Sequence, residues 1–94
     1  LQPFGIAAAE PIFASQNLRV QSPDRVGREG KHLRLRFHDA DGVPGNAIGF
    51  GFGDWATRLS LGDRIDLAYR VGVHEWNGNR DLQLTIVDVR PHTT

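Results

Sequence analysis

The chain has 94 residues, a formal net charge of zero, 39% hydrophobic and 23% charged residues, and no cysteine. This length and composition fit one small globular domain. The absence of cysteine excludes disulfides, thiolate nucleophiles and cysteine-type zinc sites. There is no signal peptide and no apolar run near the ~20 residues that span a bilayer, so we expect a cytoplasmic protein.

Basic residues are concentrated in one segment. Residues 19–36 carry six lysines or arginines and only two acidic residues, a local net charge of +4. A chain with no net charge can therefore still present a basic binding face. The chain also lacks methionine, and we expect it to be one piece of a longer protein.

The first 30 residues predict a connection, a strand and a loop. Residues 1–11 hold two prolines and a glycine around three alanines and predict a connecting segment, with one helical turn at 6–9. Residues 12–20 are rich in strand-forming residues and predict the first strand. A proline and two glycines in residues 21–30 predict a loop or an irregular strand end.

Residues 31–39 show the clearest strand pattern in the chain. Apolar and basic residues alternate strictly, as they do on a strand with one buried face. The apolar row is Leu33, Leu35 and Phe37, and the opposite row is His32, Arg34 and Arg36. Asp41-Gly42 follows and predicts a tight turn.

Residues 46–52 alternate again and predict the third strand. Ile48, Phe50 and Phe52 share one face, which we expect to be the core face, while Ala47, Gly49 and Gly51 share the other. Glycines at this spacing, continued by Gly53, indicate either a close approach by a ligand or a sharp bend of a barrel. The bend is the simpler interpretation.

The second half predicts a short helix and a long hairpin. Asp54 can cap a helix that ends at Leu59, with Trp55 closing one end of the core. Residues 64–76 alternate and predict the fourth strand, and Asn77–Asn79 form a hairpin tip before the last strand at 81–90. Residues 92–94 predict a tail.

Five strands with one helix between the third and fourth favour an all-β fold. Several alternating strands in under 100 residues indicate a small barrel, and this position of the helix is the topology of the OB-fold. We therefore expect an OB-like domain at residues 12–91. Strands two and three form the usual ligand face of this fold.

The basic row of residues 31–39 is the strongest candidate site. Arg34 and Arg36 would lie ~6.6–7 Å apart, close to the spacing of phosphates along one nucleic-acid strand. Three further residues would extend this surface: Arg28, Lys31 and His32. The alternative is an ordinary solvated face whose cations pair with the protein's own acids, namely Asp66, Glu75 and Asp88.

Aromatic residues add a second candidate feature. Trp76 flanks the predicted hairpin tip with Arg80 across the turn, and could stack on a base. The other rings on alternating strands, Phe37, Phe50, Phe52 and Tyr69, are expected in the core.

The sequence shows no pattern for catalysis or for a metal. The four histidines lack the spacing of paired metal ligands, and the sequence shows no recognisable serine–histidine–aspartate pattern of a catalytic triad. The segment that begins at Asp39 resembles a calcium loop, but its twelfth position is Phe50 in place of glutamate. We expect no cofactor and no catalysis within these residues.

Several stretches in combination resemble the carboxy-terminal OB-like domain of RecJ, a single-strand-specific DNA exonuclease of the DHH phosphoesterase superfamily. They are "PFG" and "EPIF", then "GKHLRLRF", "AIGFGFGDWA", "LGDRIDLAYRV" and "HEWNGNRDLQLTIVDVRP". The resemblance covers nearly the whole chain, from about Leu1 to Pro91.

The resemblance implies a role that composition does not. The parent enzyme would degrade single-stranded DNA from the 5′ end, with divalent metal (magnesium or manganese) in upstream catalytic domains that this chain lacks. This domain would bind or guide the strand and pack against those catalytic domains. The alternative is a structural or interaction domain whose basic face meets an acidic partner, such as a segment of a single-strand-binding protein.

Overall fold

The computed structural model describes residues 11–93, except for the side chain of Trp76. The expected connecting segment, with its helical turn, lies outside the described residues apart from Pro11. The elements are β1 (Phe13–Val26), η1 (Arg28–Gly30), β2 (His32–His38), β3 (Pro44–Gly49), α1 (Trp55–Arg58), β4 (Arg64–Trp76) and β5 (Asn79–Pro91).

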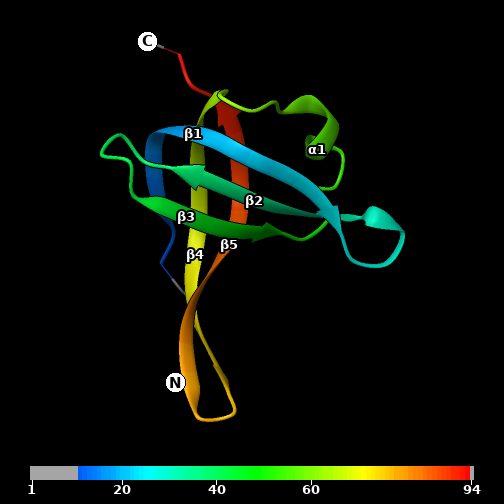
Figure 1. Ribbon diagram of the computed structural model, residues 1–94, viewed down its shortest axis with the longest axis vertical. Coiled ribbons are helices and arrows are strands. Elements are labelled where there is room, and N and C mark those ends of the chain that lie inside the picture. Colours follow the sequence, from blue (N-terminus) through cyan, green and yellow to red (C-terminus); the bar gives the residue numbers. More distant parts are fainter. Residues whose placement is uncertain (1–10, 94) are drawn as a thin grey trace.

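The five strands close into a barrel in the order β1-β2-β3-β5-β4 (Figure 1). β1 pairs with both β2 and β4, and β3 pairs with β5 in parallel, while the other pairs are antiparallel. α1 lies between β3 and β4 in the chain. The predicted OB-like barrel is therefore confirmed, including the position of its helix.

The core is formed by the apolar row of each strand. Leu33 and Leu35 of β2 and Ile65 and Leu67 of β4 are almost fully buried. The remaining buried hydrophobic residues are Leu18, Val20, Phe37, Ala47, Leu59, Ile86 and Val89. Apolar residues are thus buried against one another from every strand and from the end of α1, which is the main source of stability in a small domain.

β1 is longer than the strand predicted at 12–20, and of the two alternatives for residues 21–30, residues 21–26 form the irregular strand end, with a shift of register between Val20 and Ser22. These residues continue β1 and pair with β2, with Pro23 opposite Leu35. β1 leaves β4 after Arg19, so one of its two edges is then unpaired. A proline is tolerated in a strand at such an edge, which is why this one does not end β1.

β3 is shorter than predicted, because the chain turns after Gly49. The amide of Phe52 donates to the carbonyl of Gly49 at 3.2 Å, and the amide of Gly53 donates to the carbonyl of Lys31 at 2.9 Å. A Cβ atom at Gly53 would collide with the backbone of Gly30. The glycines therefore make a bend packed against the start of β2, and they do not form a side-chain-free strand face for a ligand.

The end of the barrel and the hairpin agree with the sequence. Trp55 of α1 packs against the core, although Asp54 makes no capping hydrogen bond through its side chain. Asn77 and Gly78 have φ of 47° and 78°, as a two-residue hairpin turn of type I′ requires. β4 and β5 extend beyond the barrel as a projecting hairpin (Figure 1). In the described chain, no helix is long and apolar enough to cross a membrane.

Candidate nucleic-acid interface

β2 presents its basic row to solvent, as its alternation predicts. Arg34 and Arg36 are exposed. Leu33, which precedes Arg34, and Leu35, which lies between the two arginines, are fully buried. The two guanidinium groups are therefore held on the outer side of the barrel by the burial of their neighbours. Arg34 and Arg36 are two positions apart on the strand, so their Cα atoms are ~6.6–7 Å apart.

Neither arginine has an ion pair among the described residues. The three acids that could have neutralised them each lie within 4 Å of a different basic side chain. Glu75 lies 3.0 Å from Arg80, Asp88 lies 3.0 Å from Arg90, and Asp66 lies 2.7 Å from the ring of His92. Asp24 is the cross-strand neighbour of Arg34, but its carboxylate accepts a hydrogen bond from Ser22 Oγ at 2.9 Å.

β3 places uncharged side chains beside these arginines. Asn46 lies opposite Arg36, and Ile48 lies opposite Arg34, in the antiparallel register of β2 and β3. Cross-strand partners project from the same face of a sheet. Asn46 and Ile48 therefore extend the outer surface, and Ile48 is only partly buried.

The prediction that Ile48 and Phe50 face the core is wrong. The inward residues of β3 are Ala47, which is 1% exposed, and Gly49. A Cβ at Gly49 would lie 2.9 Å from Cβ of Phe52 and 3.2 Å from Cδ1 of Ile86. The interior beside β3 is already filled by those two side chains, so only small residues fit inside and the larger ones face outward.

Phe50 is 57% exposed and lies directly after β3. Its ring contacts the ring of His32 edge-on, with centroids 5.3 Å apart and planes 73° from parallel. The amide of Gly51 donates to Nδ1 of His32 at 3.0 Å. His32 thus belongs to the basic row, as predicted, and it also holds the turn that carries Phe50.

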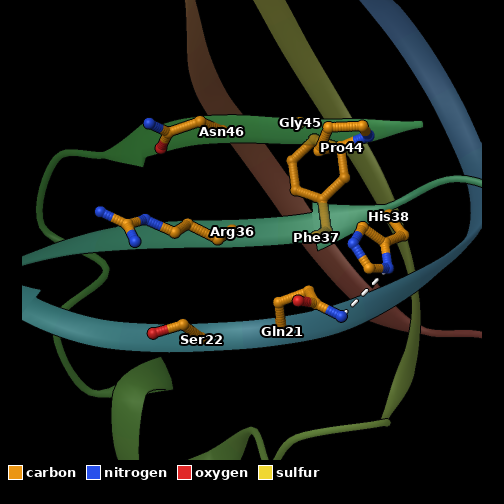
Figure 2. Close-up of a pocket in the computed structure, with 8 residues that line it drawn as sticks. All are labelled: Gln21, Ser22, Arg36, Phe37, His38, Pro44, Gly45 and Asn46. Carbon is orange, nitrogen blue, oxygen red and sulfur yellow. Dashed lines mark hydrogen bonds between the residues drawn. The ribbon is translucent and has the colours of Figure 1, made fainter. Parts of the chain in front are cut away.

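One end of this face is hollowed where β1, β2 and β3 run side by side (Figure 2). The hollow has a volume of about 430 Å³ and is lined by polar groups of Ser22, Arg36 and Asn46. Gln21 Nε2 lies 3.0 Å from His38 Nδ1 at its margin. Polar side chains from three strands therefore line the hollow together with Arg36.

The outer surface continues past β3 onto β5 and β4. Ile48 pairs with Thr85 of β5, which pairs with Arg70 of β4. Arg70 has no ion pair among the described residues, and it borders a second hollow of about 290 Å³ beside Gly72. Sequence reasoning missed Arg70, although its alternation with the apolar residues of β4 was a signal for an outward position.

The other predicted site residues lie outside the row of Arg34 and Arg36. Lys31 lies 3.1 Å from Glu29, and Arg80 is occupied by Glu75. Arg28 is exposed in η1 at the end of β1. Trp76 ends β4 at the projecting hairpin, and its side chain is not among those described. Arg80 is five residues from Thr85 on β5, or roughly 17 Å along a strand. It is therefore remote from the face formed by β2 and β3.

The face has cations and apolar groups but no metal-binding cluster. Throughout residues 11–93, no three histidine, aspartate or glutamate side chains gather in a way that could hold a metal ion. What the arrangement offers is an exposed basic row on β2 flanked by an uncharged and aromatic row on β3. Such a surface suits an anionic ligand that also carries apolar rings.

Comparisons with known proteins identify the family of this chain. The family model described as the RecJ OB domain matches residues 1–88. The single-stranded-DNA-specific exonuclease RecJ of Bacillus subtilis is 24% identical over 88 residues, which are 94% of this chain. The chain spans only 11% of the length of that relative.

Similar folds occur in solved structures. The mitochondrial single-stranded DNA binding protein Rim1 of S. cerevisiae has a TM-score of 0.65 at 13% identity, over 92% of this chain and 100% of that one. The SSB domain of a Synechococcus protein has a TM-score of 0.64 at 15% identity, over 90% and 98% of the two chains. At these identities, the likeness establishes the fold. The match over residues 1–88 goes further, and the chain belongs to the family of RecJ OB domains.

Proposed function

We propose that this domain binds single-stranded DNA on the outer face of β2 and β3, as a non-catalytic part of a longer RecJ-like 5′–3′ exonuclease. The observation that carries the proposal is the pair Arg34 and Arg36, which are exposed and have no ion pair among the described residues. The relative from B. subtilis is named for its action on single-stranded DNA, and Rim1, a neighbour in fold, is named for binding it.

Catalysis would belong to other domains of the parent chain. The matched relative is about nine times longer than this domain, since the domain covers 11% of it. Those other domains would hold any magnesium or manganese ion. This domain would guide the DNA strand toward the catalytic domains. We place the OB-like domain at residues 12–91 and the parent enzyme in the cytoplasm.

The electrostatic contribution can be measured through its salt dependence. Each phosphate neutralised on a single strand contributes about −0.7 to the slope of log K against log salt concentration. Arg34 and Arg36 together would contribute a slope of about −1.4. Binding by the isolated domain should therefore be weak at physiological salt and readily measured at low salt.

The test is a fluorescence-anisotropy titration with a labelled 12-nucleotide single strand. The double variant Arg34→Ala/Arg36→Ala should bind more weakly and with a slope less negative by about 1.4. The control is Arg19→Ala/Arg64→Ala, which removes two exposed arginines that are cross-strand neighbours on β1 and β4. An equal loss in both double variants, or none in either, would contradict the proposal.

A second role as a packing domain is favoured by a different surface. Val73 and Leu82 are cross-strand partners on the projecting hairpin and are 59% and 72% exposed. The apolar face continues toward the barrel through the partly buried pair Val71 and Leu84. Apolar surface of this kind marks contacts with other protein, and we propose that another domain of the parent chain covers it.

This second role can be tested without DNA. In the full-length parent, Val73→Ser/Leu82→Ser should lower the thermal midpoint, whereas the isolated domain should change little because both side chains are exposed there. As the control, Val43→Ser/Leu61→Ser removes two similarly exposed apolar residues from the loops before β3 and before β4. Equal effects of the two double variants in the parent would reject this docking surface. A separate measurement asks whether an acidic peptide displaces DNA from the domain. Displacement would show that the basic face can also bind an acidic protein partner.

A further inference from the structure

We infer that Phe50 is a stacking platform for an unpaired nucleobase, and that it makes the domain selective for single strands over duplexes. This inference rests on the proposed binding of DNA to the same face. Its starting observation is that a large aromatic side chain is 57% exposed directly beside the basic row. Exposed rings next to cations are the usual means by which proteins hold single-stranded nucleic acid.

The two strands of the face divide the chemistry between them. The outer row of β2 carries His32, Arg34 and Arg36, and the row beside it carries Asn46, Ile48 and Phe50. In the first row Arg34 and Arg36 offer positive charge, and the second row offers an amide, an aliphatic side chain and a ring. A nucleotide has the same division, with a charged phosphate on one side and an apolar base on the other.

The spacing of these groups fits one nucleotide. Adjacent strands are ~4.8 Å apart, and neighbouring residues on one face of a strand are ~6.6–7 Å apart. His32 lies between Phe50 and the position of Arg34, as neighbour of both. A base stacked on Phe50 would therefore place its adjacent phosphate within reach of the guanidinium of Arg34.

The platform is held in place before any ligand arrives. Gly51, the residue after Phe50, donates its amide hydrogen to Nδ1 of His32, which ties the turn that carries Phe50 to β2. The edge-on contact of the two rings adds a second attachment. A side chain that is already positioned loses less conformational entropy on binding.

This arrangement favours an unpaired base for a geometric reason. In a duplex each base is stacked between its neighbours and turns only its edges toward the protein. Phe50 can reach the face of a base only when that base is unstacked. A cation row without the ring would attract both forms through their phosphates.

The experiment compares Phe50→Ala with the wild-type domain on two single strands, a 12-nucleotide oligothymidylate and an abasic strand of equal length. On oligothymidylate, the variant should bind roughly 5- to 150-fold more weakly, the range expected for loss of one stacked base. Its salt slope should be unchanged, because no charge is removed. On the abasic strand, wild type and variant should bind alike.

Two controls make the result specific. Phe50→Tyr keeps a stacking ring and should retain most of the affinity for oligothymidylate. Leu61→Ala removes another exposed apolar side chain, 74% exposed, away from this face, and should change nothing. Because Phe50 is exposed, each variant should unfold at nearly the wild-type midpoint, which circular dichroism would verify.

The outcomes separate this inference from the proposed function. If wild type binds neither strand at low salt, the proposed binding of DNA itself fails. If wild type binds both strands and Phe50→Ala matches it on oligothymidylate, only the stacking role of Phe50 is rejected. An equal loss on the abasic strand would also reject it, because stacking requires a base.

Discussion

The ring of His92 lies 2.7 Å from the carboxylate of Asp66, measured from Nδ1 to Oδ1. The same Oδ1 accepts the amide hydrogen of Asn17 at 3.0 Å, at the irregularity where β1 crosses β4. The amide of His92 also donates to the carbonyl of Arg64 at 2.9 Å. This cluster of Asp66, Asn17 and His92 therefore joins the end of the chain to β1 and β4. His92 belongs to the segment predicted as a tail.

The cluster predicts a loss of stability in acid. The hydrogen bond from the amide of Asn17 lowers the pKa of Asp66, and the hydrogen bond from His92 adds to this effect. A carboxyl with a lower pKa in the folded protein stabilises it above the unfolded value of about 3.9. That stability is lost as the pH falls through the folded pKa. Urea unfolding of wild type and Asp66→Asn should differ at pH 7, and this difference should shrink as the pH falls below the unfolded value of about 3.9. A constant difference across this range would contradict the assignment.

Gly53 should be far less tolerant of a side chain than Gly72. A Cβ at Gly53 would collide with the backbone of Gly30, whereas nothing lies within 4 Å of a Cβ at Gly72. We expect Gly53→Ala to lower the free energy of unfolding by about 1–3 kcal/mol, as other overpacked sites do. Gly72→Ala should be neutral or slightly stabilising, because alanine restricts the unfolded chain. Denaturant titration of the two variants measures both effects, and similar values would refute the packing argument.

Arg70 should contribute to binding only for longer strands. In the register of the sheet, Arg34 lies beside Ile48, Ile48 beside Thr85, and Thr85 beside Arg70. The two arginines are therefore three strand spacings of ~4.8 Å apart. A 12-nucleotide strand can reach both arginines, and a three-nucleotide strand on Arg34 and Arg36 need not. We expect Arg70→Ala to reduce the salt slope by about 0.7 for the longer strand only. Equal effects on both lengths, measured by anisotropy and by competition, would place Arg70 within the short site.

The sequence predicted the elements whose signals are local. Strict alternation identified β2 and β4, and Asn77 with Gly78 identified the turn between the last two strands. These signals depend on neighbours in the chain, because side-chain alternation and positive φ are properties of a few consecutive residues. The helix was also found in the correct place, with Trp55 against the core.

Which of the two side-chain rows of β3 faces the core could not be predicted from alternation. Alternation separates Ile48 and Phe50 from Ala47 and Gly49, but it does not say which pair is inside. The usual rule that larger apolar residues are buried gave the wrong answer. Phe52 and Ile86 reach the interior from other segments and occupy the space beside β3.

The sequence by itself determined the barrel class, the basic row of β2 and the resemblance to RecJ, because strand periodicity and motif identity are written in consecutive residues. Only the tertiary structure decided which acids pair with which cations, and so left Arg34 and Arg36 without an ion pair among the described residues. The parallel register of β3 and β5 likewise brought Arg70 onto the face. Finally, the filled interior turned Phe50 outward. Each of these depends on distances between segments remote in sequence, which only the closed barrel sets.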